Sequence, residues 1–312
     1  MSDATAVRFS VGLPQNLTSE DPRILSAYAI RAEALGFEGL WTLDSALGGP
    51  TGHTPLLDGI HLLSHAAAVT ERPRLGVAVI VMGRRQPALL ARELATVDRL
   101  SGGRLVVGVG LGAPEGESVA ELGFPADRRV RRLVEGVGVM RALWAGEEAS
   151  FDGEVWRFSR ATVEPRPIQR PGPPVWFGAG REPPLRRAAR LGDGWIGSGS
   201  SSVEDFGRQA AFVRSALEQE GRDPARFAIA KRVYVAVEDD EQIARARLGA
   251  VIDAMYGASG LGERGAVGGP PERVAAVLRE LVAAGAQELA LTPMYGHLAQ
   301  LEALAEVVRL AR

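Results

Sequence analysis

LATVDRLSGGRLVVGVGLG, residues 94–112, is the stretch of sequence that decides the fold. Its helical run stops at the glycine pair 102–103, where a left-handed helix C-cap requires a residue without Cβ. Residues 105–109 are then almost wholly apolar, which is typical of a parallel strand covered on both faces. The C-terminal end of such a strand is where parallel α/β folds bind ligands. Here that end carries three alternate glycines: Gly108, Gly110 and Gly112.

These glycines allow two interpretations. They either give a tight β-to-α connection the positive φ that it needs, or they let the backbone lie flat against a planar ligand or a phosphate. The spacing Gly108-x-Gly110-x-x-Ala113 is also a permitted variant of the dinucleotide-binding fingerprint. That fingerprint requires a helix to open at once, whereas residues 113–116, APEG, intervene here. The dinucleotide interpretation is therefore disfavoured.

Composition and charge exclude several classes of protein. The 312 residues are 46% hydrophobic and carry a net charge of −2, so the chain can bury a large core and has no basic run for nucleic acid. It contains no run of 18 apolar residues, so no membrane partner is expected. The first five residues lack the features of a signal peptide, and no cysteine is present, which favours a cytoplasmic location and excludes thiolate catalysis. Lys231 is the only lysine, which leaves few candidates for Schiff-base chemistry.

Strand and helix patterns alternate along the whole chain. The chain shows no linker or shift in composition, so residues 1–312 are expected to form a single domain. Eight strands, each followed by a helix, predict a (β/α)8 TIM barrel. A doubly wound open sheet is the alternative, and it would leave the first and last strands unpaired. A β-hairpin insertion near 149–163 and a loop insertion near 257–269 are expected to interrupt the alternation of strands and helices. The predicted strands are 7–13, 39–43, 74–81, 104–110, 175–177, 194–197, 227–237 and 288–291.

Candidate functional residues follow the predicted strands. Asp44, after the second strand, and Glu117, after the fourth, are the acids best placed to act. Ser198 follows the sixth strand and is expected to donate its hydroxyl to a cofactor, since no G-x-S-x-G motif or histidine–acid pair is present. His61 and His65 share a helix face, but the sequence offers no HExxH motif, so no metal site is expected.

The connection Gly178-Ala179-Gly180-Arg181 joins the fifth strand to a helix. Free backbone N–H groups at a positive helix end favour anions, and the Arg181 guanidinium has a fork geometry suited to phosphate. The alternative is that the glycines merely turn the chain and that Arg181 points to water. We favour a phosphate-binding loop.

Four stretches together resemble the bacterial-luciferase-like family of flavin- and deazaflavin-dependent oxidoreductases. The most recognisable is 98–110, DRLSGGRLVVGVG. The second is 34–37, ALGF, with 40–41, LW, and Asp44. The third is 70–79 with Arg85-x-Pro87 and 91–92, AR. The fourth is Gly178-x-Gly180 followed by 192–195, GDGW. The four stretches occur in the order of the family, and the match extends from residue 9 to about residue 310.

The resemblance implies a (β/α)8 barrel that binds FMN or the deazaflavin F420 at the C-terminal ends of its strands. The ring would lie over the end of the third strand, where members often have a non-prolyl cis peptide, here Ala78–Val79. The cofactor phosphate would lie near 178–181, and Gly110 and Gly112 would allow its close approach. Arg84, Arg85 and Arg232 could meet the longer acidic tail of F420. A homodimer is expected through helices near the second and third strands.

The pair Asp44-Ser45 departs from the histidine that many relatives place after this acid. Because a serine does not replace an imidazole base, a proton-transfer mechanism of the sugar-phosphate dehydrogenase kind is disfavoured. Hydride transfer to a small organic substrate and flavin–oxygen chemistry stay open, since the cofactor itself performs the redox step. In this interpretation Asp44 and Ser45 face the ring edge, with Glu117 nearby. A non-redox barrel lyase or isomerase acting on a phosphorylated metabolite and a non-catalytic flavin-binding protein are the alternatives. The loops 45–54 and 257–269 are expected to shape the substrate pocket.

Overall fold

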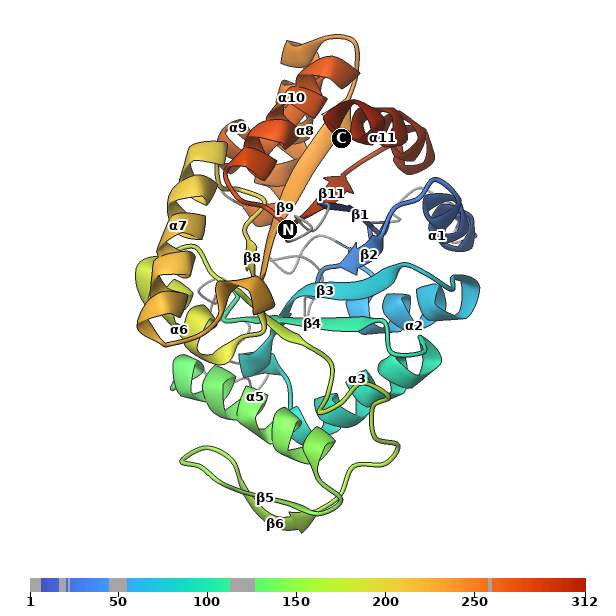
Figure 1. Ribbon diagram of the computed structural model, residues 1–312. Coiled ribbons are helices and arrows are strands. Elements are labelled where there is room, and N and C mark those ends of the chain that lie inside the picture. The colour runs from blue at the N-terminus through green and yellow to red at the C-terminus, as the bar shows by residue number, and fades with distance from the viewer. Residues whose placement is uncertain (1–6, 17–20, 22, 45–54, 113–126, 258–259) are drawn as a thin grey trace, which may run out of the picture.

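Eight parallel strands form a closed ring, and helices surround it (Figure 1). The computed structural model describes residues 7–16, 21, 23–44, 55–112, 127–257 and 260–312. The strands of the ring are β1 (Arg8–Gly12), β2 (Gly39–Thr42), β3 (Arg74–Val81), β4 (Leu105–Gly110), β7 (Val175–Gly178), β8 (Gly194–Gly197), β9 (Ala228–Val237) and β11 (Glu288–Pro293). The helices are α1 (Ile24–Ala34), α2 (Gly59–Val69), α3 (Pro87–Leu100), α5 (Arg129–Ala145), α6 (Glu182–Leu191), α7 (Val203–Gln219), α8 (Glu241–Tyr256), α9 (Leu261–Gly265), α10 (Pro271–Ala283) and α11 (His297–Ala311).

Two strand pairings close the ring and exclude the open doubly wound sheet. β1 pairs in parallel with β11, with Arg8 opposite Glu288. β8 pairs in parallel with β9, with Gly194 opposite Ala228. The predicted (β/α)8 barrel is therefore confirmed, because a doubly wound sheet would leave two edge strands.

The barrel interior is filled by side chains rather than open. Trp41 and Trp176 face each other there, with ring centroids 5.3 Å apart, and small residues such as Ala78, Ala230 and Ala290 pack around them. At the end of the ring where the strands begin, buried Glu288 accepts hydrogen bonds from Ser10 Oγ at 2.7 Å and from Trp41 Nε1 at 2.9 Å. Groups at this end hold the strands together, so chemistry is expected at the opposite end.

The signature stretch 94–112 acts mainly as scaffold. Gly102 and Gly103 have φ values of 68° and 86° and follow α3 as predicted. Asp98, which is fully buried, accepts hydrogen bonds from the backbone N–H groups of Ile168 and Gln169 at 2.7 and 3.0 Å. Arg104 donates to backbone carbonyls on the neighbouring connection 67–73. These contacts explain the strength of the sequence signal, because each buried charge needs fixed partners.

The predicted hairpin is present, whereas the predicted loop near 260 is not a plain loop. β5 (Ala149–Asp152) and β6 (Arg157–Ala161) pair antiparallel and lie outside α5 (Figure 1). The prediction of a loop over 257–269 was wrong in its second half. There α9 is followed by β10 (Ala266–Gly269), which pairs in parallel with 234–237 of β9. Local pattern did not reveal this strand, because half of its four residues are glycine and its partner lies about thirty residues earlier.

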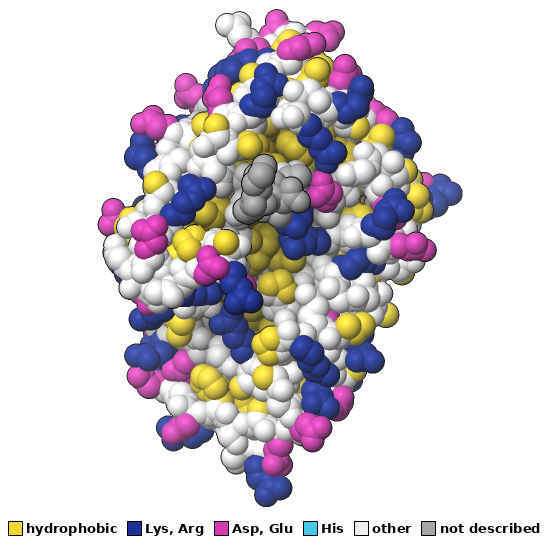
Figure 2. All heavy atoms as spheres, in the orientation of Figure 1, with side chains coloured by type: hydrophobic (Ala, Val, Ile, Leu, Met, Phe, Trp, Pro, Cys, Tyr) yellow, Lys and Arg dark blue, Asp and Glu magenta, His cyan; other side chains and the backbone are white. Residues whose placement is uncertain are grey.

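Charged side chains of both signs are mixed over the face shown in Figure 2, with no continuous basic field on it. Within the described ranges, no helix combines the length and apolar character that crossing a lipid bilayer demands.

Candidate functional site

The C-terminal ends of the strands bring together most of the residues that the sequence singled out. The described ones are Asp44 after β2, Ala78 and Val79 on β3, Gly110 and Gly112 at the end of β4, 178–181 after β7, and Ser198 after β8. Ser45 and Glu117 lie outside the described residues, as do residues 45–54 of the expected substrate loop.

The peptide bond Ala78–Val79 is cis, as the resemblance implied. The pairing of β3 with β4 shifts register between Val77 and Ile80, so the strand bulges there. Ala78 is buried in the barrel interior, whereas Val79 is only part-buried. Bulges of this kind re-aim side chains beside active sites, and this one directs Val79 over the adjoining strands.

Glycines on β4 and β7 make room for the side chain of Val79. A Cβ at Gly110 would lie 2.6 Å from Val79 Cγ2, and a Cβ at Gly178 would lie 2.8 Å from Val79 Cγ1. A Cβ at Gly112, which has φ of +69°, would lie 2.9 Å from Val81 Cγ1. The structure therefore gives these glycines a packing reason that applies before any cofactor is considered.

Asp44 is a buried, paired carboxylate rather than a free acid. Its side chain is 2% exposed and forms an ion pair with Arg85, and its Oδ2 accepts a hydrogen bond from the backbone N–H of Val81 at 3.1 Å. Arg85 also pairs with Asp58 at 3.2 Å. Burial alone would raise the pKa of Asp58, but hydrogen bonds from His61 and Arg85 outweigh it and lower the pKa to about 2. The cluster joins the ends of β2 and β3 to α2 and holds the backbone directly after the bulge.

The loop 178–181 leads into α6, and only part of the expected anion geometry is present. The helix begins Glu182-Pro183-Pro184, and prolines have no N–H, so two donors expected at this helix end are missing. The Ala179 carbonyl accepts a hydrogen bond from Trp195 Nε1 at 2.9 Å, and the Gly180 carbonyl accepts one from Gln209 Nε2 at 3.1 Å. The carbonyls are thus turned to the protein, and the side chain of Arg181 is exposed.

The end of β8 carries an exposed hydroxyl pair that Lys231 holds in place. Ser198 Oγ and Ser200 Oγ are 2.9 Å apart. The side chain of Lys231 donates to the Ser198 carbonyl and, at 3.0 and 2.8 Å, to the carbonyl and hydroxyl of Ser201. Lys231 is 2% exposed, so the only lysine of the chain is a buried anchor for this loop.

The stability of the protein is expected to rise with pH through the titration of Lys231. Burial lowers the pKa of its ammonium, the charge of Arg232 lowers it further and Asp205 opposes them, leaving a pKa of about 7. An unfolded lysine has a pKa of about 10.4, so between these values the unfolded chain holds more protons. The free energy of unfolding then increases across this window, by up to about 1.4 kcal/mol per pH unit.

Urea unfolding at pH 7.5 and 9.5 measures this increase, and Lys231→Met, which lacks the titrating group, is the matched control. We expect wild type to gain more stability than the variant over this interval. An equal change in both proteins would contradict the assignment.

Arg232, which the sequence offered only as a contact for the acidic tail of F420, lines a small cavity among β1, β2, β9 and β11. It precedes Tyr234 on the inward face of β9, with its guanidinium 5.4 Å from the Tyr234 ring centroid, and the hydroxyls of Tyr234 and Tyr256 are 2.5 Å apart. Two of its side-chain nitrogens, Nε and Nη1, are shielded from solvent and have no hydrogen-bond partner. The available signal was a pair of adjacent cations inside an otherwise apolar strand.

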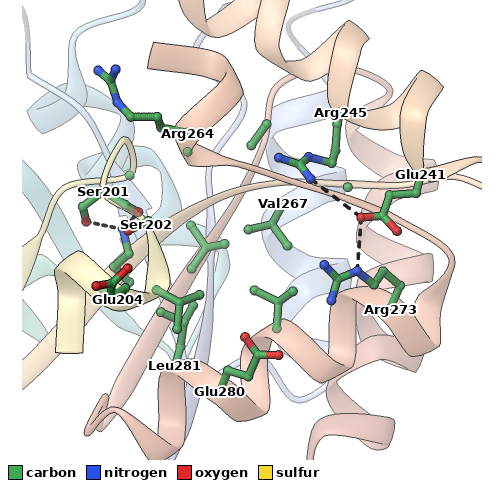
Figure 3. A pocket seen from close by; sticks show the side chains of 18 residues that line it. Ser201, Ser202, Glu204, Glu241, Arg245, Arg264, Val267, Arg273, Glu280 and Leu281 are labelled. Carbon is green, nitrogen blue, oxygen red and sulfur yellow. Dashed lines mark hydrogen bonds and ion pairs between the residues drawn. The ribbon is translucent and has the colours of Figure 1, made fainter. Parts of the chain in front are cut away.

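A cavity lies on the flank of the barrel, outside the ring of strands (Figure 3). It has a volume of about 300 Å³ and lies among α7, α8, β10 and α10. Its charges are largely paired within the protein. Glu241 lies between Arg245 and Arg273, at 3.8 and 3.1 Å, and Glu204 pairs with Arg208 at 2.6 Å. Arg264 and Glu280 also line the cavity.

Sequence comparison decides the family once this geometry is known. Residues 5–261 match the sequence model of the family described as luciferase-like monooxygenase. The chain belongs to the luciferase-like monooxygenase family.

Relatives in this luciferase-like family use two kinds of cofactor. An FMNH2-dependent dimethylsulfone monooxygenase from Pseudomonas putida is 33% identical over 193 residues, 61% of this chain and 52% of that protein. An F420-dependent glucose-6-phosphate dehydrogenase from Kineococcus radiotolerans is 30% identical over 251 residues, 79% of this chain and 73% of that protein. The chain thus aligns with only about half the length of the first relative.

A solved structure supports the same luciferase-like fold. An F420-dependent secondary alcohol dehydrogenase, in complex with an F420–acetone adduct, superposes with a TM-score of 0.85. It is 18% identical, and the match covers 98% of this chain and 99% of that chain. At this identity the likeness concerns the fold alone.

No metal-binding cluster occurs in the part of this luciferase-like chain that the structure describes. His61 Nδ1 contacts Asp58 at 2.8 Å and His65 Nε2 contacts Ser26 at 2.9 Å. The two histidines that share a helix face are therefore engaged with different partners.

Proposed function

We propose that this protein is an oxidoreductase that uses FMN or F420 to transform a small organic substrate at the C-terminal ends of its strands. Family membership supports the redox class, and the relatives named above supply both cofactors as candidates. The observation that carries the assignment of the site is the bulge at Ala78–Val79, which Asp44 anchors through the N–H of Val81 and through its ion pair with Arg85.

The described residues fit such a cofactor. Val79 offers an apolar, part-exposed side chain for the face of a flat ring, and the ends of β4 and β7 beside it carry no side chains that would obstruct the ring. Exposed Ser198 and Arg181 offer a hydroxyl and a positive charge for a phosphate. We place the ring over 78–79 and the phosphate near 178–181, with Gly110 and Gly112 on the adjoining strand.

When bound, either cofactor supplies the hydride transfer, and FMN also supplies oxygen activation. The chain provides a platform for the cofactor ring, formed by Val79, the charge of Arg181 that retains the phosphate, and a barrel interior that excludes water. Asp44 positions the platform through Val81 and Arg85. Ser45 and Glu117 remain the proposed side chains at the edge of the ring, where they would orient the substrate or exchange a proton.

Titration with oxidised and reduced FMN and F420, followed by absorbance, tests the proposed function directly. Saturable binding with turnover of a reductant supports an oxidoreductase. Binding without turnover under any reductant or oxygen would identify a non-catalytic flavin-binding protein. Binding of neither cofactor would refute the proposal and revive a non-redox barrel lyase or isomerase, for which the comparisons offer no support.

Arg181→Ala is expected to weaken the binding of the cofactor at least tenfold, about 1.4 kcal/mol. The reason is that this exposed guanidinium is the cation of the proposed phosphate loop, and prolines have removed other donors there. Arg190→Ala, in the last turn of the same helix, is the matched control and should leave the dissociation constant unchanged. Equal affinities of wild type and Arg181→Ala would refute the phosphate assignment.

We also propose a homodimer that assembles through the helices near β2 and β3. Leu89 and Leu100 on α3 are 63% and 59% exposed, which agrees with a surface that a second copy covers. Sedimentation equilibrium measures this, and a monomer at micromolar concentration would contradict it. A cytoplasmic location, expected from the cysteine-free sequence, remains part of the proposal.

A further inference from the structure

A guanidinium without a described counter-charge lies inside the barrel. Arg232 alternates along β9 with Lys231 and Val233, which face the helices, and shares the inward face with Ala230 and Tyr234. Its Nε and Nη1 are buried and have no hydrogen-bond partner. Arg85, another arginine of the site, has two carboxylates. Arg232 differs from it in having no carboxylate partner among the described residues.

The protein itself offers Arg232 little compensation. An arginine stays charged in proteins, and leaving a buried donor unpaired costs about 1–3 kcal/mol, more for a charged group. Tyr234 contacts the guanidinium through its ring and through a side-chain hydrogen bond. A cation–π contact at such a site is worth only about 0.5–2 kcal/mol, and Nε and Nη1 still have no acceptor. A group with negatively charged oxygens would satisfy both nitrogens at once, because the guanidinium fork matches a carboxylate or sulfonate.

Arg232 borders a narrow cavity on one side of the barrel mouth. The cavity has a volume of about 30 Å³ and is lined by residues from the ends of β1, β2, β9 and β11, including Trp41, Met255 and Met294. That volume accommodates about two water-sized groups, so a small head group fits and a ring system does not. Polar neighbours are already engaged: Gln15 donates to the carbonyls of Leu43 and Leu57.

The cavity lies away from the proposed phosphate loop. Ala78 is its only lining residue from β3, and none comes from β4, β7 or β8. Val79, in contrast, is directed towards β4 and β7 through Gly110 and Gly178. A ring supported by Val79 with its phosphate near 178–181 therefore leaves the cavity on the β1, β2 and β11 side for the second reactant.

We propose that Arg232 binds the anionic oxygens of the substrate, which is a small organic acid carrying a carboxylate or sulfonate. This inference rests on the proposed function, because the substrate is taken to share the strand ends with the cofactor. The apolar side chains of Trp41 and Met294 would contact the carbon part of the acid. Arg232 thereby sets both substrate charge and substrate orientation.

The test compares matched anionic and neutral probes. Dissociation constants of acetate and methanesulfonate, and of their neutral counterparts acetamide and dimethyl sulfone, are measured by ligand-observed NMR with and without cofactor. For Arg232→Gln we expect at least tenfold weaker binding of both anions and less than a threefold change for the neutral probes. Arg157→Gln, an exposed arginine of the β5–β6 hairpin, should change neither.

Arg232→Lys provides a second variant, because it keeps the charge while removing the fork. It should bind the anions more tightly than Arg232→Gln does, and circular dichroism verifies that each variant is folded. If Arg232→Gln is unfolded, the comparison of wild type with Arg232→Lys decides, with weaker anion binding and unchanged neutral binding as the expected result.

Three results would overturn the proposal: no preference of wild type for anions, equal anion affinity in wild type and Arg232→Gln, or equal losses for anionic and neutral probes. Weaker binding of the reduced cofactor alone in Arg232→Gln would assign the charge to the cofactor and would also overturn it. Failure of the proposed function is recognised separately, because wild type would then bind neither FMN nor F420 whatever the anions do.

Discussion

Asp44→Ala is expected to destabilise the protein by about 3 kcal/mol and to weaken cofactor binding. Breaking a buried ion pair typically costs about 3–5 kcal/mol. We take the low end because Arg85 keeps Asp58 as a partner, at 3.2 Å. The backbone N–H of Val81 also loses its acceptor. Since Val81 closely follows the bulge, the platform formed by Val79 should shift, and affinity for the cofactor should fall together with stability.

Urea unfolding and cofactor titration of the same preparations measure the two effects of Asp44→Ala. Asp152→Ala removes an aspartate whose ion pair with Arg157 is highly exposed, and it should change stability by less than about 1 kcal/mol. Asp44→Asn keeps an acceptor for Val81 and should be intermediate. If Asp44→Ala retains full stability and loses only turnover, Asp44 is a catalytic acid and the positioning role is wrong.

Gly110→Ala is expected to cost about 2–3 kcal/mol, because the added Cβ would lie 2.6 Å from Val79 Cγ2. Overpacking of a tight interior typically costs about 1–3 kcal/mol, and a valine has no flexible end that can withdraw. The displaced side chain would move towards the position of the ring. We therefore expect cofactor affinity to fall as well.

A double-mutant cycle with Val79→Ala separates packing from cofactor contact. If the Val79 side chain is what Gly110 accommodates, the double variant should be more stable than the sum of the single effects by at least about 1 kcal/mol. Gly83→Ala is a suitable control, since its Cβ would meet nothing within 4 Å. Additive stabilities in the cofactor-free protein would refute the packing explanation for Gly110.

Several parts of this architecture could be predicted because their signals are local. The apolar run in 94–112 predicted the buried strand β4, and the glycine pair before it predicted the positive φ values found at Gly102 and Gly103. The prediction of a cis peptide at Ala78–Val79 rested on the family resemblance rather than on the residues themselves, and the structure contains that bond. β10 was missed, since four residues with two glycines carry no alternation and gain their structure from pairing with β9.

The candidate site was predictable in position but not in the role of each residue. Asp44 does lie at a strand end, yet it is paired with Arg85, which lies 41 residues later in the chain. Gly110 and Gly178 do lie at strand ends, yet the atoms nearest to a Cβ added at either position belong to Val79. Arg232 looked like one more arginine of an arginine-rich chain, and its isolation appears only when the neighbours on β1, β2 and β11 surround it.

The sequence by itself determined the order of the ring strands and their helices, which candidate residues follow which strand, and the family, because periodicity, caps and short motifs depend on near neighbours in the chain. The tertiary structure alone decided which charges are paired. Ring closure brings residues far apart in sequence within hydrogen-bond distance, so Asp44 gains an arginine and Lys231 gains three oxygen acceptors, whereas the buried Nε and Nη1 of Arg232 have no described acceptor.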